Sequence, residues 1–172
     1  ARCLRRAIEL QPRLLGASLM LSHIYALDGR DEEALAELGR ALKVAPDDVG
    51  SLMLAGTLRQ RRGDFRGAAE HYERLLAKNP QFAAAANNLA YLYSEHLGRE
   101  DEAFELAQKA HRLMGGEPHV TDTFGWILFK RREYKWALGL LQESAEQLSD
   151  QPEVLFHLGM AQEALGDESS AR

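Results

Sequence analysis

The chain has 172 residues, 45% of them hydrophobic and 27% charged, proportions typical of a folded globular protein with its own core. Its formal net charge of −5 argues against a general nucleic-acid binder, which needs a basic face to displace counterions from phosphates. Its apolar runs are short and interrupted by charged residues, which argues against a membrane-spanning segment, and its single cysteine, Cys3, excludes an internal disulfide.

The predicted elements are helices, and most of them come in pairs. A single helix is predicted at residues 1–11. The pairs begin near Leu15, Val49, Ala83 and Pro118, and a last helix begins near Pro152. In the second pair, an apolar pattern of helical period runs to Arg62, stops at Gly63-Asp64 and resumes from Phe65 to Lys78. Glycine favours the left-handed end of a helix, so each pair is predicted to be two short helices joined by a tight turn.

A period of about 34 residues runs through the sequence and indicates a repeat protein. Two of the series that show it are Ala34, Ala68, Ala103, Ala137 and Ala171, and Gly29, Gly63, Gly98 and Gly166, with Arg132 in the place of a missing glycine. The series gain one residue between positions 90 and 98. Helices this short are marginal alone, so the units are expected to stack. Small residues are expected at the crossings: Gly56, Ala68, Ala90, Ala103, Gly125, Ala137 and Gly159.

The phase of the period divides the chain into a single array. It predicts the second half of a repeat at 1–14, full repeats at 15–48, 49–82, 83–117 and 118–151, and the start of a fifth at 152–172. In the fifth repeat, the second helix is expected to begin after Gly166. Because both ends fall inside repeats, the sequence is expected to be a segment of a longer array.

These repeats resemble the tetratricopeptide repeat family, whose pattern is a 34-residue helix–turn–helix with Leu-Gly, Tyr, Ala, an aromatic residue and Pro at set places. The matches include Leu21, Tyr25, Ala34 and Pro46 in the first full repeat and Gly56, Phe65, Ala68, Tyr72 and Pro80 in the second. Arg59 stands where Tyr is usual, and an extra residue lies between Tyr93 and Gly98. The resemblance implies an all-α fold, a right-handed α-α superhelix (solenoid) whose concave face is lined by the first helix of each repeat and binds a peptide or helix.

The resemblance also implies which side chains face a partner. Carried over position by position, and with Phe129 one turn further along its helix, the predicted partner-binding residues are Leu19, His23, Met53, Thr57, Asn87, Tyr91, Asp122, Trp126, Phe129, Phe156 and Met160. Aromatic and methionine side chains give adaptable contact area, which predicts an apolar groove for an amphipathic helix or extended segment. The alternative is that several of them only fill the seam between adjacent first helices. One subclass of the family is known to bind the carboxylate terminus of heat-shock chaperones with Lys, Arg and Asn side chains on successive first helices. This clamp is not expected here, because only Asn88 has the right chemistry among the corresponding residues, which are Leu19, His23, Leu54, Ala84 and Asn88.

No catalytic, metal or cofactor site is predicted. The six histidines form no helical pair with a second ligand at zinc-site spacing, and Cys3 lacks an activating partner. The basic runs 59–62 and 130–132 end first helices, where cations complement the helix dipole, so anion or nucleic-acid binding is the less favoured interpretation. Trp136 is expected on an outer face, where a second contact point is also less favoured.

The predicted function is a protein–protein interaction scaffold that binds a partner peptide or helix and helps assemble a multiprotein complex. The spacing of the Leu, Tyr and Gly residues in the repeats most resembles that of bacterial arrays, which suggests envelope, polysaccharide-export or secretion machinery. The alternative is a substrate-recruiting or regulatory region of a larger enzyme such as a glycosyltransferase. Weak head-to-tail self-association is a third interpretation. The expected partner is a protein or peptide. Neither nucleic-acid binding nor a membrane-spanning segment is expected of this chain, and both a cytoplasmic and a periplasmic location stay open.

Overall fold

The computed structural model describes residues 2–11 and 13–170, with side chains as far as residue 166. Every regular element within these residues is helical, which confirms the predicted all-α class for the part of the chain that is described. The chain forms two compact units, Ala1–Pro80 and Gln81–Arg172, each with its own buried interior. None of the described helices is both long and apolar enough to cross a bilayer.

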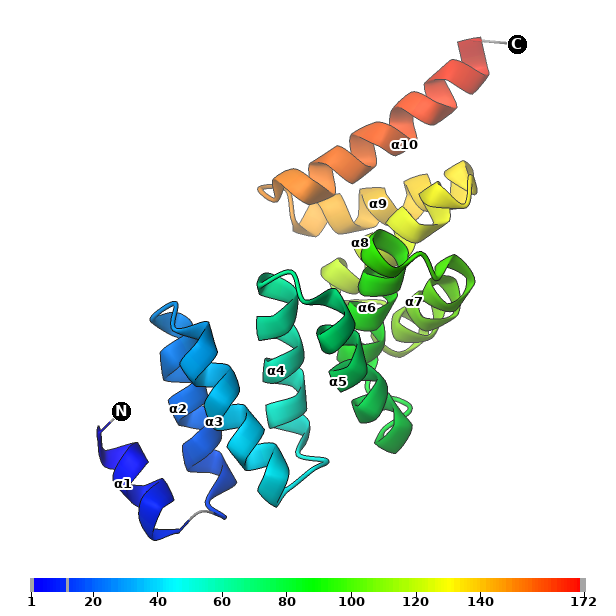
Figure 1. Ribbon diagram of the computed structural model, residues 1–172. Coiled ribbons are helices and arrows are strands. Elements are labelled where there is room, and N and C mark those ends of the chain that lie inside the picture. Colours follow the sequence, from blue (N-terminus) through cyan, green and yellow to red (C-terminus); the bar gives the residue numbers. More distant parts are fainter. Residues whose placement is uncertain (1, 12, 171–172) are drawn as a thin grey trace. The chain divides into compact units, whose positions relative to one another are not determined.

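The first unit is a row of antiparallel helices (Figure 1). Its elements are α1 (Arg2–Leu10), α2 (Leu15–Leu27), α3 (Asp31–Val44), α4 (Val49–Arg61) and α5 (Phe65–Lys78). Helix α2 packs on α3 and α4 packs on α5, while α2 also contacts α4. Leu21, Tyr25, Leu38 and Leu58 meet in one buried cluster of this unit. These helices are too short to be stable alone, and their apolar faces are covered by neighbouring helices.

The second unit continues the same pairing (Figure 1). Its elements are α6 (Ala83–Leu92), the π-helix η1 (Tyr93–Leu97), α7 (Glu100–Met114), α8 (Pro118–Lys130), α9 (Tyr134–Gln147) and α10 (Pro152–Ser170). Helix α8 packs on α9 and also contacts both α6 and α10. Phe124, Leu128 and Leu141 are buried where α8 and α9 meet. The first helices of successive pairs thus lie next to one another, and this layer carries the site described below.

The turns inside the pairs use the left-handed backbone that the glycine series predicts. Gly29, Gly63 and Gly98 have φ of 73°, 78° and 66°. Arg132, which stands in the place of the missing glycine, adopts the same conformation with φ of 65°. A side chain in this region is disfavoured by about 1–2 kcal/mol, because Cβ approaches the following carbonyl oxygen. The repeat geometry therefore overrides the local preference of Arg132.

The extra residue of the third pair is taken up by η1. In the other three pairs, the hydrogen bond that closes the turn spans five residues, for example from the Arg30 amide to the Tyr25 carbonyl at 2.8 Å. In the third pair, the corresponding bond runs from the Arg99 amide to the Tyr93 carbonyl at 3.0 Å and spans six residues. A π-helical turn accommodates one more residue than an α-helical turn. The insertion is thus absorbed between Tyr93 and Gly98, where the period gains its residue.

Two expectations for the last helix are wrong. Helix α10 runs without a break from Pro152 to Ser170, so the turn expected at Gly166 does not form. Glycine permits a left-handed turn but does not require one, and within the described residues α10 continues past Gly166 to Ser170. Gly159 was expected at a close helix crossing, yet nothing lies within 4 Å of the place where its Cβ would be. No second helix among the described residues covers it.

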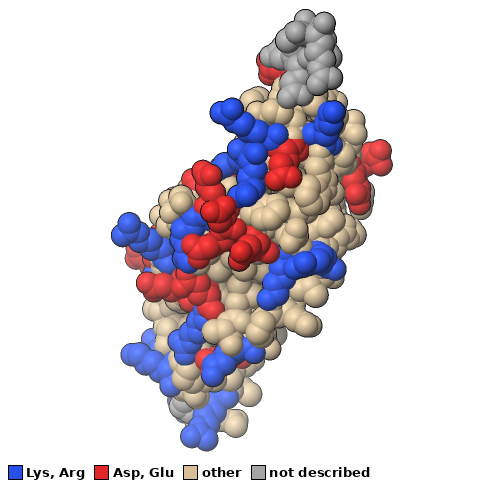
Figure 2. All heavy atoms as spheres, turned by 90° about the vertical axis from the view of Figure 1, so that its right-hand side faces the viewer, with Lys and Arg blue, Asp and Glu red and all other residues tan. Residues whose placement is uncertain are grey.

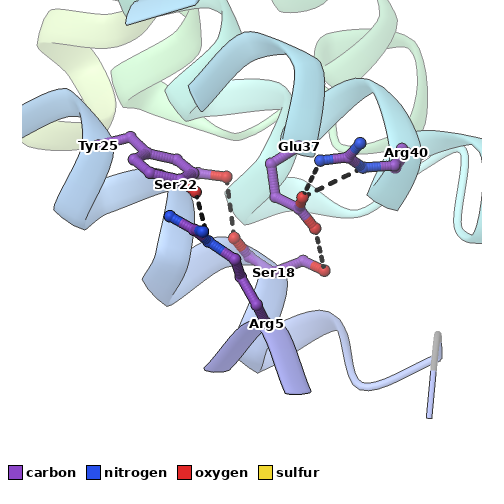
Figure 3. A network of polar contacts seen from close by, with 6 residues as sticks. All are labelled: Arg5, Ser18, Ser22, Tyr25, Glu37 and Arg40. Carbon is purple, nitrogen blue, oxygen red and sulfur yellow. Dashed lines mark hydrogen bonds and ion pairs between the residues drawn. The ribbon is translucent and has the colours of Figure 1, made fainter. Parts of the chain in front are cut away.

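A buried carboxylate connects α2 and α3 in the first unit (Figure 3). Glu37 is only 3% exposed. It accepts a hydrogen bond from the Ser18 hydroxyl at 3.1 Å and is paired with Arg40. In the same network, the Arg5 guanidinium on α1 donates to the Tyr25 hydroxyl at 2.9 Å. Because the Glu37 charge is both paired and hydrogen-bonded, it fixes the register of α3 on α2 without an unsatisfied group.

Four cations of the two basic runs, Arg61, Arg62, Lys130 and Arg131, are paired with carboxylates of the preceding repeat. Arg61 bonds to Asp31 and Arg62 to Glu32, each 30 residues earlier, and Arg131 lies 2.8 Å from Asp101. Figure 2 shows acidic and basic side chains intermixed on one face. Exposed pairs of this kind contribute about 0–1 kcal/mol each, so their main consequence here is charge balance. These pairs offset much of the positive charge of the two runs.

Candidate functional site

The candidate site is a pocket of about 190 Å³ in the second unit. Helix α6 supplies Asn87 and Tyr91, and helix α8 supplies Asp122 and Trp126. Each pair is separated by one helical turn, so both side chains of a pair point to the same face of their helix. Four of the predicted partner-binding residues therefore line one pocket. Two neighbours of Trp126 extend this surface: Phe129 on α8, and Phe156 on α10, which is 58% exposed.

The remaining predicted residues lie outside this pocket. Met160 is half-buried further along α10. Leu19, His23, Met53 and Thr57 belong to the first unit. Leu19 packs against the buried cluster of that unit, which fits the alternative that it fills the seam between helices. His23 and Thr57 are exposed.

An aromatic stack forms the interior side of the pocket. The Trp126 ring is parallel to the His157 ring at 4.2 Å between centroids, and parallel to the Phe129 ring at 4.9 Å. His157 on α10 is buried, and its Nδ1 lies 2.9 Å from Asp122 Oδ2 on α8. The Asp122–His157 bond and the ring stack together fix α10 against α8 and hold Trp126 in place.

The electrostatics of the pocket are acidic. Besides Asp122, the carboxylates of Glu95 and Glu153 line it. Burial raises the pKa of the Tyr91 hydroxyl, and the negative charges of Glu153 and Glu95 raise it further. A phenol whose ionisation is opposed by neighbouring carboxylates lies in a negative potential. The pocket is therefore suited to a cationic or hydrogen-bond-donating group and unsuited to an anion.

The π-helix positions one wall of the pocket. Ser94 and Glu95 lie on η1 and both line the pocket. Lys130, the last residue of α8, donates from Nζ to the Ser94 carbonyl oxygen at 2.7 Å and lies 2.9 Å from Glu95. This contact connects the end of α8 to the segment that contains the extra residue. The irregularity in the period is thus part of the site.

Sequence reasoning missed the acidic half of this pocket. Glu95, Glu153 and His157 were not among the predicted residues, and the pocket is more polar than the apolar groove expected from Tyr91, Trp126 and Phe156. The physical reason is that Glu153 and His157 lie one position or one turn away from the positions carried over from the family. The extra residue near Glu95 was the one signal in the sequence that pointed to this segment.

A larger hollow, of about 390 Å³, lies beside Trp136 at the start of α9. Trp136 is 47% exposed and rests edge-on against Phe124 at 5.3 Å. The residues that line this hollow are exposed or half-buried, so it offers no buried polar group to orient a ligand. In the described part of the chain, no three His, Cys, Asp or Glu side chains gather in a way that would hold a metal ion.

Comparison with known proteins identifies the repeats. Two sequence profiles described as tetratricopeptide repeat match residues 15–48 and 53–117, together more than half of the chain. The chain belongs to the tetratricopeptide repeat family. Proteins of this family act as scaffolds for protein–protein interaction and are generally not enzymes, so the pocket in α6, α8 and α10 lies on a fold that binds protein or peptide partners.

Individual relatives are similar over part of their length. A TPR repeat-containing protein of Pseudomonas aeruginosa is 31% identical over 143 residues, which are 82% of this chain and 24% of that protein. The human protein O-mannosyl-transferase TMTC3 is 30% identical over 93 residues, 54% of this chain and 10% of that protein. The tetratricopeptide repeat chain thus spans about a quarter or less of both. The solved structure of YrrB, described as a TPR protein with an unusual peptide-binding site, has a TM-score of 0.76 at 18% identity and covers 92% of this chain and 81% of its own.

Proposed function

We propose that the second unit binds a peptide or helix of a partner protein in the pocket formed by α6, η1, α8 and α10. We further propose that the protein thereby helps assemble a multiprotein complex in a bacterial envelope, polysaccharide-export or secretion system. The observation that carries the proposal is that Asn87, Tyr91, Asp122 and Trp126, four side chains inferred from the sequence as partner-facing, line one open pocket. The similarity to a Pseudomonas aeruginosa protein supports a bacterial setting.

The aromatic surface beside the pocket supports a protein ligand. Phe156 is 58% exposed although its ring lies only 6.0 Å from that of Trp126. An exposed phenylalanine next to a half-buried tryptophan and tyrosine offers the kind of anchor that dominates binding at protein interfaces. We further propose that the chain is one continuous array, with repeats at 15–48, 49–82, 83–117 and 118–151.

The test compares site variants with a matched aromatic control. Tyr91→Ala and Phe156→Ala remove side chains at the pocket, whereas Trp136→Ala removes an exposed aromatic side chain on α9. The parent protein carrying each change is crosslinked in its source cells, and the captured proteins are quantified. We expect both pocket variants to lose envelope or export proteins that wild type and Trp136→Ala retain, with unchanged helicity. Equal capture by all four proteins would refute this binding surface.

A second function is favoured by the similarity to the human O-mannosyl-transferase. In that case the repeats recruit a protein substrate to a catalytic domain elsewhere in the parent protein. The distinguishing measurement is turnover: Tyr91→Ala would raise KM for a protein acceptor and leave turnover of a small acceptor unchanged. A parent protein without any transferase activity excludes this function and leaves the scaffold function in place.

A further inference from the structure

Two residues that line the pocket, Asp122 and Asn87, each have a buried side-chain oxygen without a hydrogen-bond donor among the described residues. Asp122 is 7% exposed, and its side chain is 10% exposed. Its Oδ2 is bonded to His157, but its Oδ1 is buried and unpartnered among the described residues. Asn87 Oδ1 is buried and unpartnered in the same way. Leaving a buried acceptor without a donor is unfavourable, and both residues line the same pocket. A ligand whose N–H groups reach these oxygens would therefore gain hydrogen bonds that the described residues leave unmade.

The charges around these atoms select the kind of donor. Three carboxylates line the pocket, those of Glu95, Asp122 and Glu153. Lys130 offsets the charge of Glu95 at 2.9 Å, and one oxygen of Asp122 is bonded to His157. The surplus is negative, and residues 81–172 carry 15 acidic against 8 basic side chains, which attracts cationic partners from a distance. A neutral amide would satisfy one oxygen, whereas a cation also gains from the charge.

A guanidinium group fits this arrangement better than an ammonium group. Arginine offers five N–H donors in a planar fork, can bond several acceptors at once and gives up its hydration more readily than lysine. The Tyr91 ring, which is half-buried at the same pocket, adds a face for a cation. Both neighbours of Trp126 stack parallel to its ring, so Tyr91 rather than Trp126 is the aromatic ring available.

We propose that this pocket binds the side chain of an arginine in a partner peptide, with Asp122 Oδ1 and Asn87 Oδ1 as acceptors, Glu153 as the charge at the mouth, and an apolar residue next to the arginine resting on Phe156. This inference rests on the proposed function and names the residue that the partner presents. The peptide source is favoured over a free small molecule because the exposed Phe156 ring extends the surface beyond the pocket itself.

The test uses capped peptides of the sequence Gly-Phe-X-Gly, in which X is arginine, lysine or the uncharged arginine analogue citrulline, together with free L-arginine. Binding is followed by NMR of the nitrogen-labelled protein. The indole N–H signals of Trp126 and Trp136 report the pocket and an unrelated surface in one spectrum. We expect saturable shifts at Trp126 and not at Trp136, and a Kd for the arginine peptide at least about tenfold below that of the citrulline peptide, the difference of one charge-assisted hydrogen bond.

Variants identify the acceptors. Asp122→Asn keeps the shape of the buried side chain, and we expect it to raise the Kd of the arginine peptide about tenfold or more. Glu153→Gln is an exposed change with little risk to folding, and it should raise the Kd several-fold. Glu163→Gln, an exposed change further along α10, should leave the Kd unchanged. The peptides should bind more weakly as salt is added, since the pocket attracts them by charge.

Several outcomes would overturn the proposal. They are equal binding of the arginine and citrulline peptides, no binding of any peptide, an unchanged Kd in folded Asp122→Asn and Glu153→Gln, or free L-arginine binding as tightly as the peptide. The last would make the pocket a small-molecule site. If the crosslinking experiment still shows capture that depends on Tyr91 and Phe156, the proposed function stands and only the arginine preference fails.

Discussion

Gly56 on α4 closely approaches the Tyr72 ring on α5, and replacing it measures how tightly these two helices pack. A Cβ atom on Gly56 would lie 2.6 Å from Cε1 and 2.7 Å from Cζ of Tyr72. The Tyr72 side chain is fully buried and its ring is rigid, so it has no free space to move into. Overpacking of this kind costs about 1–3 kcal/mol. Alanine in a helix is favoured over glycine by about 0.8–1 kcal/mol. We therefore expect Gly56→Ala to lower the free energy of unfolding by about 1 kcal/mol.

Gly39 is the matched control in the same unit. It lies inside α3, is exposed, and has no atom within 4 Å of its Cβ position. Gly39→Ala should gain only the helix preference and raise the free energy of unfolding by about 0.5–1 kcal/mol. Urea unfolding followed by far-ultraviolet circular dichroism gives both values on the same transition. The two glycine-to-alanine changes are thus expected to have opposite signs.

The double variant with Tyr72→Leu locates the cause. A smaller side chain at position 72 leaves room for the new methyl group, so Gly56→Ala should cost less in that background than in wild type. If Gly56→Ala and Gly39→Ala stabilise the protein equally, the approach of Gly56 to Tyr72 does not limit the packing and the argument from the close contact fails.

Three further predictions concern the turns and the pH dependence. Asp64→Ala should lower the free energy of unfolding by about 1 kcal/mol in urea unfolding, because the Asp64 carboxylate caps α5 by accepting from the Gly67 amide at 3.0 Å, and Asp64→Asn should cost less. Arg132→Gly should raise the free energy of unfolding by about 0.5 kcal/mol, because removing the steric cost of a side chain at positive φ outweighs the greater chain entropy of glycine in the unfolded state. A lower melting temperature would contradict this. Burial, assisted by the charge of Arg59, lowers the pKa of His71 below its ordinary value of 6.5. Stability from His71 is therefore complete above pH 6.5 and lost as the pH falls towards its folded pKa, so unfolding curves of His71→Gln should depend less on pH in that range than those of wild type.

The positions of the helices could be predicted from the sequence because they depend on local signals. The α4 and α5 bounds, Val49–Arg61 and Phe65–Lys78, follow from an apolar period, a glycine turn and a capping aspartate. The left-handed turns at Gly29, Gly63 and Gly98 follow from the freedom of glycine. The same reasoning was wrong at Gly166, because a turn also needs a following helix that packs back.

The site could be predicted only in part, because it depends on contacts between helices. Tyr91 and Trp126 were expected to face a partner from their place in the repeat, and they do line the pocket. The bond between Asp122 and His157 joins residues 35 apart and depends on how α10 is placed against α8. The repeat period shows which positions are equivalent, but it does not show which side chains of neighbouring repeats are in contact.

The segment that contains the extra residue near Tyr93 supplies part of the pocket wall in the second unit. An array that stacks in fixed phase must absorb an insertion without moving the faces that pack, and η1 does so because it adds a residue between α6 and the Gly98 turn. The wider turn presents the Ser94 carbonyl to Lys130 and the Glu95 carboxylate to the pocket. The residues that recur in every repeat thus specify the fold, whereas the π-helix that takes up the extra residue contributes Ser94 and Glu95 to the site, and π-helical turns are frequent at functional sites.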